Sequence, residues 1–167
     1  MSSYKEVEGC LIEKSLNGEF DVIAHGCNCF NLQGAGIAAQ MSKIFETNTF
    51  LMEKDGKGSI NKLGTIDYEI FLIDHYGNSE LANCTLEEYE EGDLIVVNAY
   101  TQYRPGANLD YEALTLCLRK MNHIFKGKYI GLPKIGAGIA GGDWNFIKTI
   151  IQTTLVDCSV TIVNFKK

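Results

Sequence analysis

The segment 22–40, with the sequence VIAHGCNCFNLQGAGIAAQ, constrains the fold more than any other part of the chain. Residues 22–24 form a short apolar run of the kind that a buried strand needs, and polar and small residues follow at its carboxyl end. Gly34 and Gly36 then allow backbone conformations that a Cβ would forbid. Residues 37–45 have an apolar face at helical spacing. The pattern predicts a strand, a glycine turn and a helix whose first N–H groups can bind an anion.

A second segment, residues 135–144, repeats this pattern with the sequence IGAGIAGGDW. The letters GAGIA occur at 34–38 and again at 136–140. Ligands of open α/β sheets bind at the carboxyl ends of the strands, so we expect the two loops to face one another there. A pair of opposed, amide-lined loops suits a diphosphate. For either loop alone, a tight turn without a ligand is the alternative, and neither matches the Rossmann or Walker pattern.

Length and composition fit one soluble domain spanning residues 1–167. The chain is long enough to bury one core without disulfides. Its hydrophobic fraction of 46% and charged fraction of 22% are ordinary for a globular protein. No apolar run approaches the length of a membrane span, and the N-terminal residues lack the hydrophobic core of a secretory signal. We therefore expect a cytoplasmic protein without membrane association.

The charge and the cysteines exclude two further classes of site. A net charge of −6 argues against an extended nucleic-acid surface, so backbone amides are expected to hold any phosphate of the ligand. Cys27 and Cys29 form a C-x-C pair, but the other four cysteines offer no second ligand pair of the zinc-site type. Reduced thiols in a core are therefore expected, with no metal and no organic cofactor.

The remaining pattern predicts alternating strands and helices. Asp93 opens the strongest buried strand of the chain, DLIVVNAYTQ. Residues 48–63 are polar and are expected to form a surface excursion, and residues 75–93 have the least clear pattern. Further strands are predicted at residues 5–13, from Phe20, and at 65–73, 128–133 and 160–165, with helices at 111–125 and 143–155. Such alternation predicts a three-layer α/β/α domain.

These segments resemble the macrodomain family over nearly the whole chain, from EGCLIE through AHGCNCFNLQGAGIA and LPKIGAGIAGGDW to the last strand. Within it, the chain is most similar to the branch that contains ADP-ribose 1″-phosphate phosphatases and lysine-dependent ADP-ribosyl hydrolases. The resemblance implies an α/β/α fold with a central mixed sheet, and ADP-ribose or a derivative as the ligand. It places the diphosphate between the loops and the distal ribose beside His25 and Asn28.

The same resemblance implies the ligand contacts. They are Cys10, Leu11, Gly34, Ala35, Gly36, Ile37, Ile135, Gly136, Ala137, Gly138, Ile139 and Ala140.

The chain departs from the family pattern at several positions. It has H-G-C-N where many macrodomains have N-A-A-N, so that His25 replaces the first asparagine, and Cys10 stands where an adenine-binding aspartate is common. Gln102 and Ala140 stand where the hydrolases carry their catalytic lysine and aspartate, which argues against lysine catalysis.

A phosphatase reaction on ADP-ribose 1″-phosphate is consistent with these residues. Histidine titrates near neutral pH, so His25 is the candidate general acid or base. Asn28 could orient ribose hydroxyls or water, the loop amides could stabilise the phosphoryl charge, and Asp143 could position water. The alternatives are a structural histidine, an asparagine that holds the turn, and an aspartate that only caps a helix.

Three classes of function therefore remain open. The first is a phosphatase that converts ADP-ribose 1″-phosphate to ADP-ribose and phosphate. The second is a hydrolase that removes ADP-ribose from protein or nucleic acid, which Gln102 and Ala140 disfavour. The third is a non-catalytic ADP-ribose-binding module, which needs the loops but not His25. In each case we expect a monomer that takes a small-molecule ligand.

Overall fold

The computed structural model describes residues 3–50 and 58–165 of the chain. Within these residues the strands form one mixed sheet of seven strands, in the order β1-β7-β6-β2-β5-β3-β4. The pairs from β1 to β5 in this order are parallel, whereas β3 pairs antiparallel with both β5 and β4. The strands are β1 (Ser3–Gly9), β2 (Val22–Asn28), β3 (Ile66–Ile73), β4 (Ser79–Leu81), β5 (Leu94–Gln102), β6 (Tyr129–Leu132) and β7 (Ser159–Phe165).

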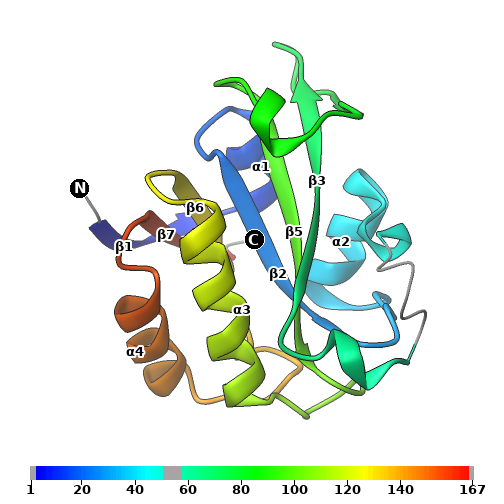
Figure 1. The fold of residues 1–167 in the computed structure, drawn as a ribbon, viewed down its shortest axis with the longest axis vertical. Coiled ribbons are helices and arrows are strands. Elements are labelled where there is room, and N and C mark those ends of the chain that lie inside the picture. The colour runs from blue at the N-terminus through cyan, green and yellow to red at the C-terminus, as the bar shows by residue number, and fades with distance from the viewer. Residues whose placement is uncertain (1–2, 51–57, 166–167) are drawn as a thin grey trace.

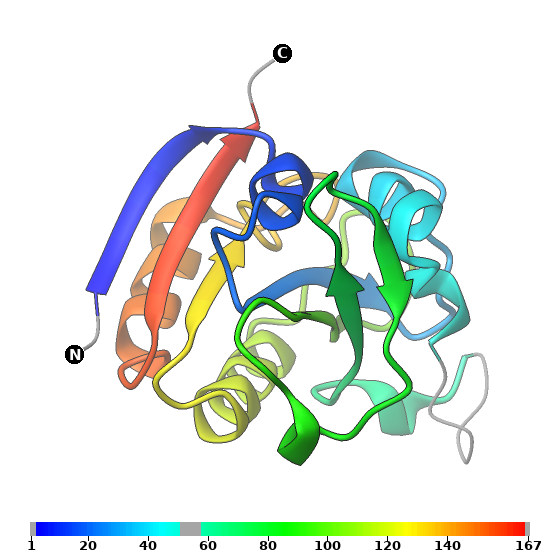
Figure 2. The same cartoon turned by 90° about the horizontal axis from the view of Figure 1, so that it is seen from above.

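Helices cover both faces of this sheet (Figures 1 and 2). The α-helices are α1 (Leu11–Leu16), α2 (Gly36–Phe45), α3 (Tyr111–Ile124) and α4 (Trp144–Thr154), and short 3₁₀ helices are η1 (Thr47–Thr49), η2 (Ile60–Lys62) and η3 (Leu86–Glu88). Leu118 of α3 and Ile151 of α4 belong to a core cluster with Val97 of β5. Met41 of α2 and Leu11 of α1 belong to a second cluster on the other face. The expected three-layer α/β/α arrangement is confirmed.

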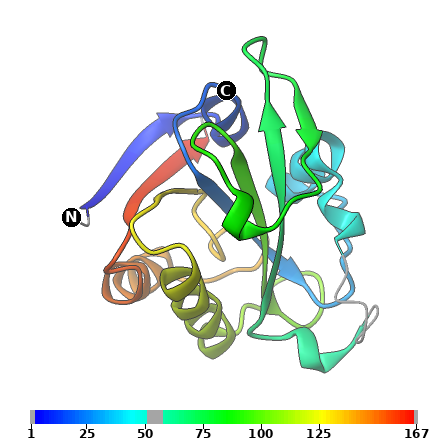
Figure 3. The same ribbon diagram turned by 45° about the horizontal axis from the view of Figure 1, so that its top comes forward.

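The central strands are buried on both faces, as parallel strands under two helix layers must be. All nine residues of β5 are buried, in agreement with its long apolar pattern. In the sheet order, β5, β3 and β4 follow β2 on one side of the molecule, and β1 and β7 lie on the other side (Figure 3). Because β2, β5 and β6 are parallel, their carboxyl ends lie at the same edge of the sheet, where loops can form a site.

Two predicted segments differ from the structure. The first strand, expected to run to Glu13, ends at Gly9, whose φ of 146° is unfavourable for other residues, and α1 follows with Leu11 and Ile12 packed into the core. The expected surface excursion at 48–63 is partly buried, because Phe50 and Lys62 are inside. Lys62 Nζ donates to the carbonyl of Cys29 at 3.2 Å. Residues 51–57 of that excursion lie outside the described residues.

Candidate functional site

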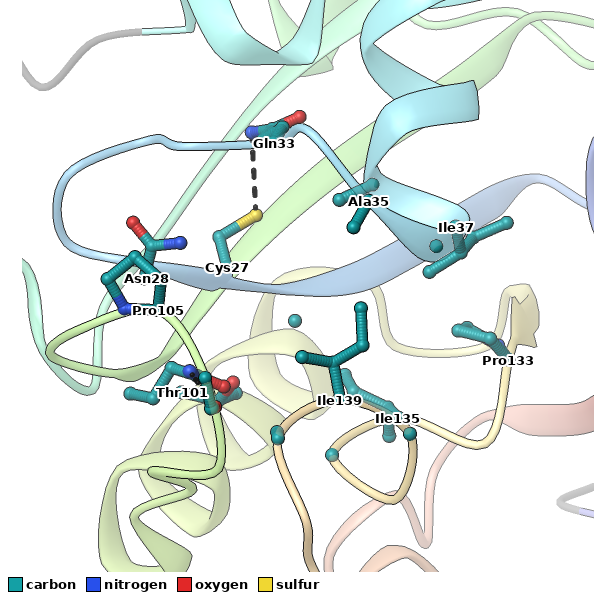
Figure 4. Close-up of a pocket in the computed structure, with 18 of the residues that line it drawn as sticks. Cys27, Asn28, Gln33, Ala35, Ile37, Thr101, Pro105, Pro133, Ile135 and Ile139 are labelled. Atoms are coloured by element: carbon teal, nitrogen blue, oxygen red, sulfur yellow. Dashed lines mark hydrogen bonds between the residues drawn. The ribbon is translucent and has the colours of Figure 1, made fainter.

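Two adjoining cavities lie at the carboxyl ends of β2, β5 and β6, and Figure 4 shows the first of them. The first has a volume of about 430 Å³ and is lined by both glycine loops, the end of β2 and the residues that follow β5. The second has a volume of about 460 Å³ and lies between α1, α2 and the end of β7. The two cavities share four lining residues: Gly36, Ile37, Pro133 and Lys134. They therefore form one continuous site with two compartments.

The first glycine loop leads into α2 at the junction of the cavities. Ala35 is the N-cap residue and has extended backbone angles, and no side chain caps this helix end. Gly36 has a φ of 61°, a left-handed conformation that residues with a Cβ rarely adopt. The uncapped N–H groups of the first helical turn are thus left for a ligand.

The second glycine loop is held by its own hydrogen bonds. The N–H of Gly142 donates to the carbonyl of Gly136 at 2.8 Å, and the N–H of Gly141 donates to that of Gly138 at 3.0 Å. Ile139 projects from this loop with 60% of its surface exposed. Its Cδ1 atom lies 3.5 Å from the position that a Cβ would take at Gly36. Ile139 therefore spans the gap between the loops, as Figure 4 shows, and covers the space beneath them.

Asn28 lines the first cavity and also holds the turn that follows β2. Its Nδ2 donates to the carbonyl of Leu32 at 2.9 Å. Its Oδ1 accepts hydrogen bonds from the N–H groups of Phe30 at 3.0 Å and Leu32 at 3.2 Å. The Asn28 side chain therefore holds the turn, as the alternative interpretation proposed. Both of its polar atoms already have hydrogen-bond partners.

His25 is not where the sequence pattern places it. The side chain is fully buried and is not among the residues that line either cavity. Its Nε2 lies 2.7 Å from Oδ1 of Asn98, its partner in the register between β2 and β5. Burial lowers the pKa of His25 to about 4, so the ring is neutral at physiological pH. A buried, neutral ring that lines neither cavity disfavours the expected role of His25 as general acid or base, which stays a prediction.

Instead, His25 belongs to a closed ring of buried hydrogen-bonding groups. Asn98 Nδ2 donates to the carbonyl of Thr47 at 2.8 Å, and Thr47 Oγ1 donates to Oε1 of Gln33 at 2.5 Å. Gln33 Nε2 lies 3.7 Å from Sγ of Cys27, and that sulfur lies 3.5 Å from Nε2 of His25. Figure 4 shows the contact between Gln33 and Cys27, both of which line the first cavity. The ring fixes this cavity wall to the sheet.

Asp143 also lies away from the cavities. It is exposed, and its Oδ1 accepts a hydrogen bond from the N–H of Asn145 at 3.0 Å, which makes it the N-cap of α4. Its own N–H donates to the hydroxyl of Tyr111 at 2.8 Å. Asp143 is not a lining residue of either cavity. The helix-cap alternative therefore describes its contacts, and its expected role in positioning water stays a prediction.

Comparison with known proteins places the chain in a family. No family model matches it. Over 170 residues the chain is 32% identical to an uncharacterized 17.5 kDa protein from the tk-vs intergenic region of Enterobacteria phage T4, and the alignment covers 97% of this chain and 96% of the phage protein. The chain belongs to the family of this phage protein.

Solved structures identify the fold. The macrodomain of Mycobacterium tuberculosis DarG matches with a TM-score of 0.66 at 17% identity, over 98% of both chains. Thermosipho africanus DarTG in complex with ADP-ribose matches with a TM-score of 0.68 at 13% identity, over 98% of this chain and 42% of that chain. The fold is that of a macrodomain. At these identities the similarity shows the fold alone.

Most of the ligand contacts expected from the sequence line the cavities. Cys10 and Leu11 line the second cavity, the first loop lines the first, and Ala137 is the one residue of the expected set that lines neither. The lining residues that sequence reasoning missed include Gln33, Gln40, Thr101, Pro105, Gly106, Pro133, Lys134, Val163, Asn164 and Phe165. Pro133 and Lys134 could have been found, because they directly precede the second loop at the end of a predicted strand. Thr101 and Phe165 could not, because only the tertiary fold brings their strand ends to the site.

Gln102 lines the first cavity and has a structural role there. Its Nε2 donates to the carbonyls of Arg104 at 2.6 Å and Gly106 at 2.9 Å, which holds the loop after β5 in place.

Among the described residues, no group of three or more His, Cys, Asp or Glu side chains could hold a metal ion. Within the same residues, no helix is both long enough and apolar enough to cross a membrane.

Proposed function

We propose that this macrodomain binds ADP-ribose or its 1″-phosphate across the two joined cavities. The adenosine would occupy the second cavity, the diphosphate the junction between the glycine loops, and the distal ribose the first cavity near Asn28. The observation that carries the proposal is the shared lining at Gly36 and Ile37, where the uncapped end of α2 lies between the two compartments.

The dimensions and chemistry of the site support this placement. Each compartment falls within the range of about 300–1,000 Å³ that is typical of small-molecule sites. The second compartment offers apolar walls for a base, from Leu11, Ile37 and Val163. The junction offers N–H groups and the positive end of the α2 dipole, which favour phosphate oxygens.

We further propose hydrolysis of the phosphate monoester of ADP-ribose 1″-phosphate as the reaction. Water would attack phosphorus, the bond from phosphorus to the ribose oxygen would break, and that oxygen would take a proton. The N–H groups of the loops would stabilise the charge on the phosphoryl oxygens. Since His25 lies outside the cavities, the proton would come through solvent. Removal of ADP-ribose by a lysine mechanism is disfavoured, because Gln102 and Ala140 line the site where that mechanism needs a lysine and an aspartate.

Calorimetric titration with ADP-ribose tests binding, and the Gly34→Val variant sharpens the test. No heavy atom lies within 4 Å of the position that a Cβ would take at Gly34, and this glycine has no positive φ, so a valine is expected to keep the fold. Its side chain would fill the first cavity, and we expect binding to weaken at least about 100-fold, as for loss of a central contact. Thermal melting checks that the variant is folded. Absence of binding by the wild type contradicts the proposal.

Phosphate release from ADP-ribose 1″-phosphate tests the reaction separately. We expect release by the wild type and none by Gly34→Val. Tight binding of ADP-ribose without release would instead assign the chain to the non-catalytic ADP-ribose-binding class.

A further inference from the structure

The cavity walls contain one charged side chain among the described residues that line them. That residue is Lys134, and it lines both compartments. The chain as a whole has a net charge of −6. Lys134 therefore places a positive charge on the described cavity walls of a molecule that is negative overall. A cation at this position attracts an anion to the junction and offsets the repulsion by the rest of the protein.

The backbone at Lys134 is hydrogen-bonded into the second loop, and its ammonium group lies near the ring of Trp144. The N–H of Ala137 donates to the carbonyl of Lys134 at 3.1 Å, and Pro133 precedes it. Lys134 Nζ lies 5.8 Å from the centroid of the Trp144 ring, at the outer limit of a cation–π contact. The ion pairs found within the described residues are Lys14 with Glu19 and Lys148 with Glu6, and neither involves Lys134. Within the described residues, the Lys134 ammonium group thus has a ring contact and no ion pair.

We infer that Lys134 is a specificity residue that recognises the diphosphate of the bound nucleotide by charge. The inference rests on the proposed function, because it places that diphosphate at the junction of the cavities. It adds a side-chain contact to the backbone amides that were expected to hold the phosphates alone. The lysine would select ligands with two linked phosphates over the nucleoside and would raise the rate at which an anionic ligand enters the site.

Three variants test this inference by calorimetric titration with ADP-ribose at low and high salt. Lys134→Gln removes the charge and keeps the length, and Lys134→Arg keeps the charge. Lys128→Gln is the matched control, because Lys128 also lies over an aromatic ring, that of Tyr89 at 4.2 Å, but lines neither cavity. All three keep a long side chain at a position that is not fully buried, so each is expected to fold.

We expect Lys134→Gln to weaken ADP-ribose binding roughly 2- to 5-fold at low salt, the range for an exposed charge pair. The difference from wild type should shrink at high salt, because salt screens exposed charges. Lys134→Arg should bind within about 2-fold of the wild type, and Lys128→Gln should match it. Equal binding by Lys134→Gln, an equal loss in Lys128→Gln, or a loss that salt does not change would each overturn the inference. If the wild type does not bind ADP-ribose, the proposed function itself fails.

Discussion

At the scale of single residues, His25 shows how burial changes what a side chain can do. Its residue type predicts proton exchange with a ligand, and the ring lies instead in the core against Asn98. The last three residues of β2, Gly26, Cys27 and Asn28, line the first cavity, whereas His25 comes one residue earlier in the strand and lines neither cavity. The His25→Ala variant should therefore lose mainly stability, by roughly 1–3 kcal/mol, since it leaves the Asn98 amide without its partner.

The buried His25 also predicts a pH dependence of folding. Its pKa is lowered from 6.5 to about 4 in the folded state, so the unfolded chain binds the proton more readily. The stabilising contribution is complete above about pH 6.5 and is lost as the pH falls toward about 4, by about 3 kcal/mol in total. Asp67 acts in the opposite direction, because burial raises its pKa to about 6 and protonation then favours the folded state. The two effects must therefore be separated.

A comparison of the wild type with His25→Gln separates them, since both proteins keep Asp67. We expect the difference in urea unfolding free energy between them to be smaller at about pH 4.5 than at about pH 7.5, by roughly 2–3 kcal/mol. A difference that stays constant with pH would show that His25 does not titrate in this range. Circular dichroism at each pH checks that both proteins are folded before urea is added.

At the scale of elements, the two glycine loops act together through Ile139. This side chain spans from the second loop to Gly36 and is 60% exposed, so it contributes little to the core. We expect Ile139→Ala to leave the melting temperature nearly unchanged. We expect it to weaken ADP-ribose binding about 3- to 10-fold, mainly through faster dissociation, because the apolar cover over the ligand is lost.

Ile60→Ala is the matched control for this prediction. Ile60 is 58% exposed, lies in η2 and does not line either cavity. Stopped-flow measurement of the ADP-ribose dissociation rate should show an increase in Ile139→Ala and none in Ile60→Ala. Equal rates in the two variants would show that Ile139 does not cover the ligand.

Elements that carry a strong local pattern are predictable from sequence, and those decided by packing are not. The residues of β5 follow from an apolar run that only a buried strand accommodates, and α3 follows from apolar residues at helical spacing. The helix α1 escapes prediction because the apolar residues Leu11 and Ile12 directly follow the strand, and their residue types also suit a strand. Only the backbone turn at Gly9 shows that the strand ends before them.

At the scale of the whole molecule, ligand binding and stability should be linked. A ligand that binds only the folded state at about 100 times its Kd stabilises that state by about 2.7 kcal/mol. For a domain of this size, ADP-ribose at that excess should raise the melting temperature by roughly 5–10 °C. Differential scanning fluorimetry measures the shift, and Gly34→Val, which should bind at least about 100-fold more weakly, should show at most about 1–2 °C. The same shift in wild type and variant would indicate binding outside the two cavities.

The amino-acid sequence by itself determined the α/β class, the central strands, the two glycine loops and the edge of the sheet at which they meet. These features follow from local chemistry, since apolar runs, glycines and helix starts act within a few residues. Only the tertiary structure decided how far along β2 the site extends, because a central strand is buried on both faces and its apolar composition does not show which of its residues line a cavity. That choice placed His25 in a closed polar ring with Asn98 and left Lys134 at the junction of the cavities.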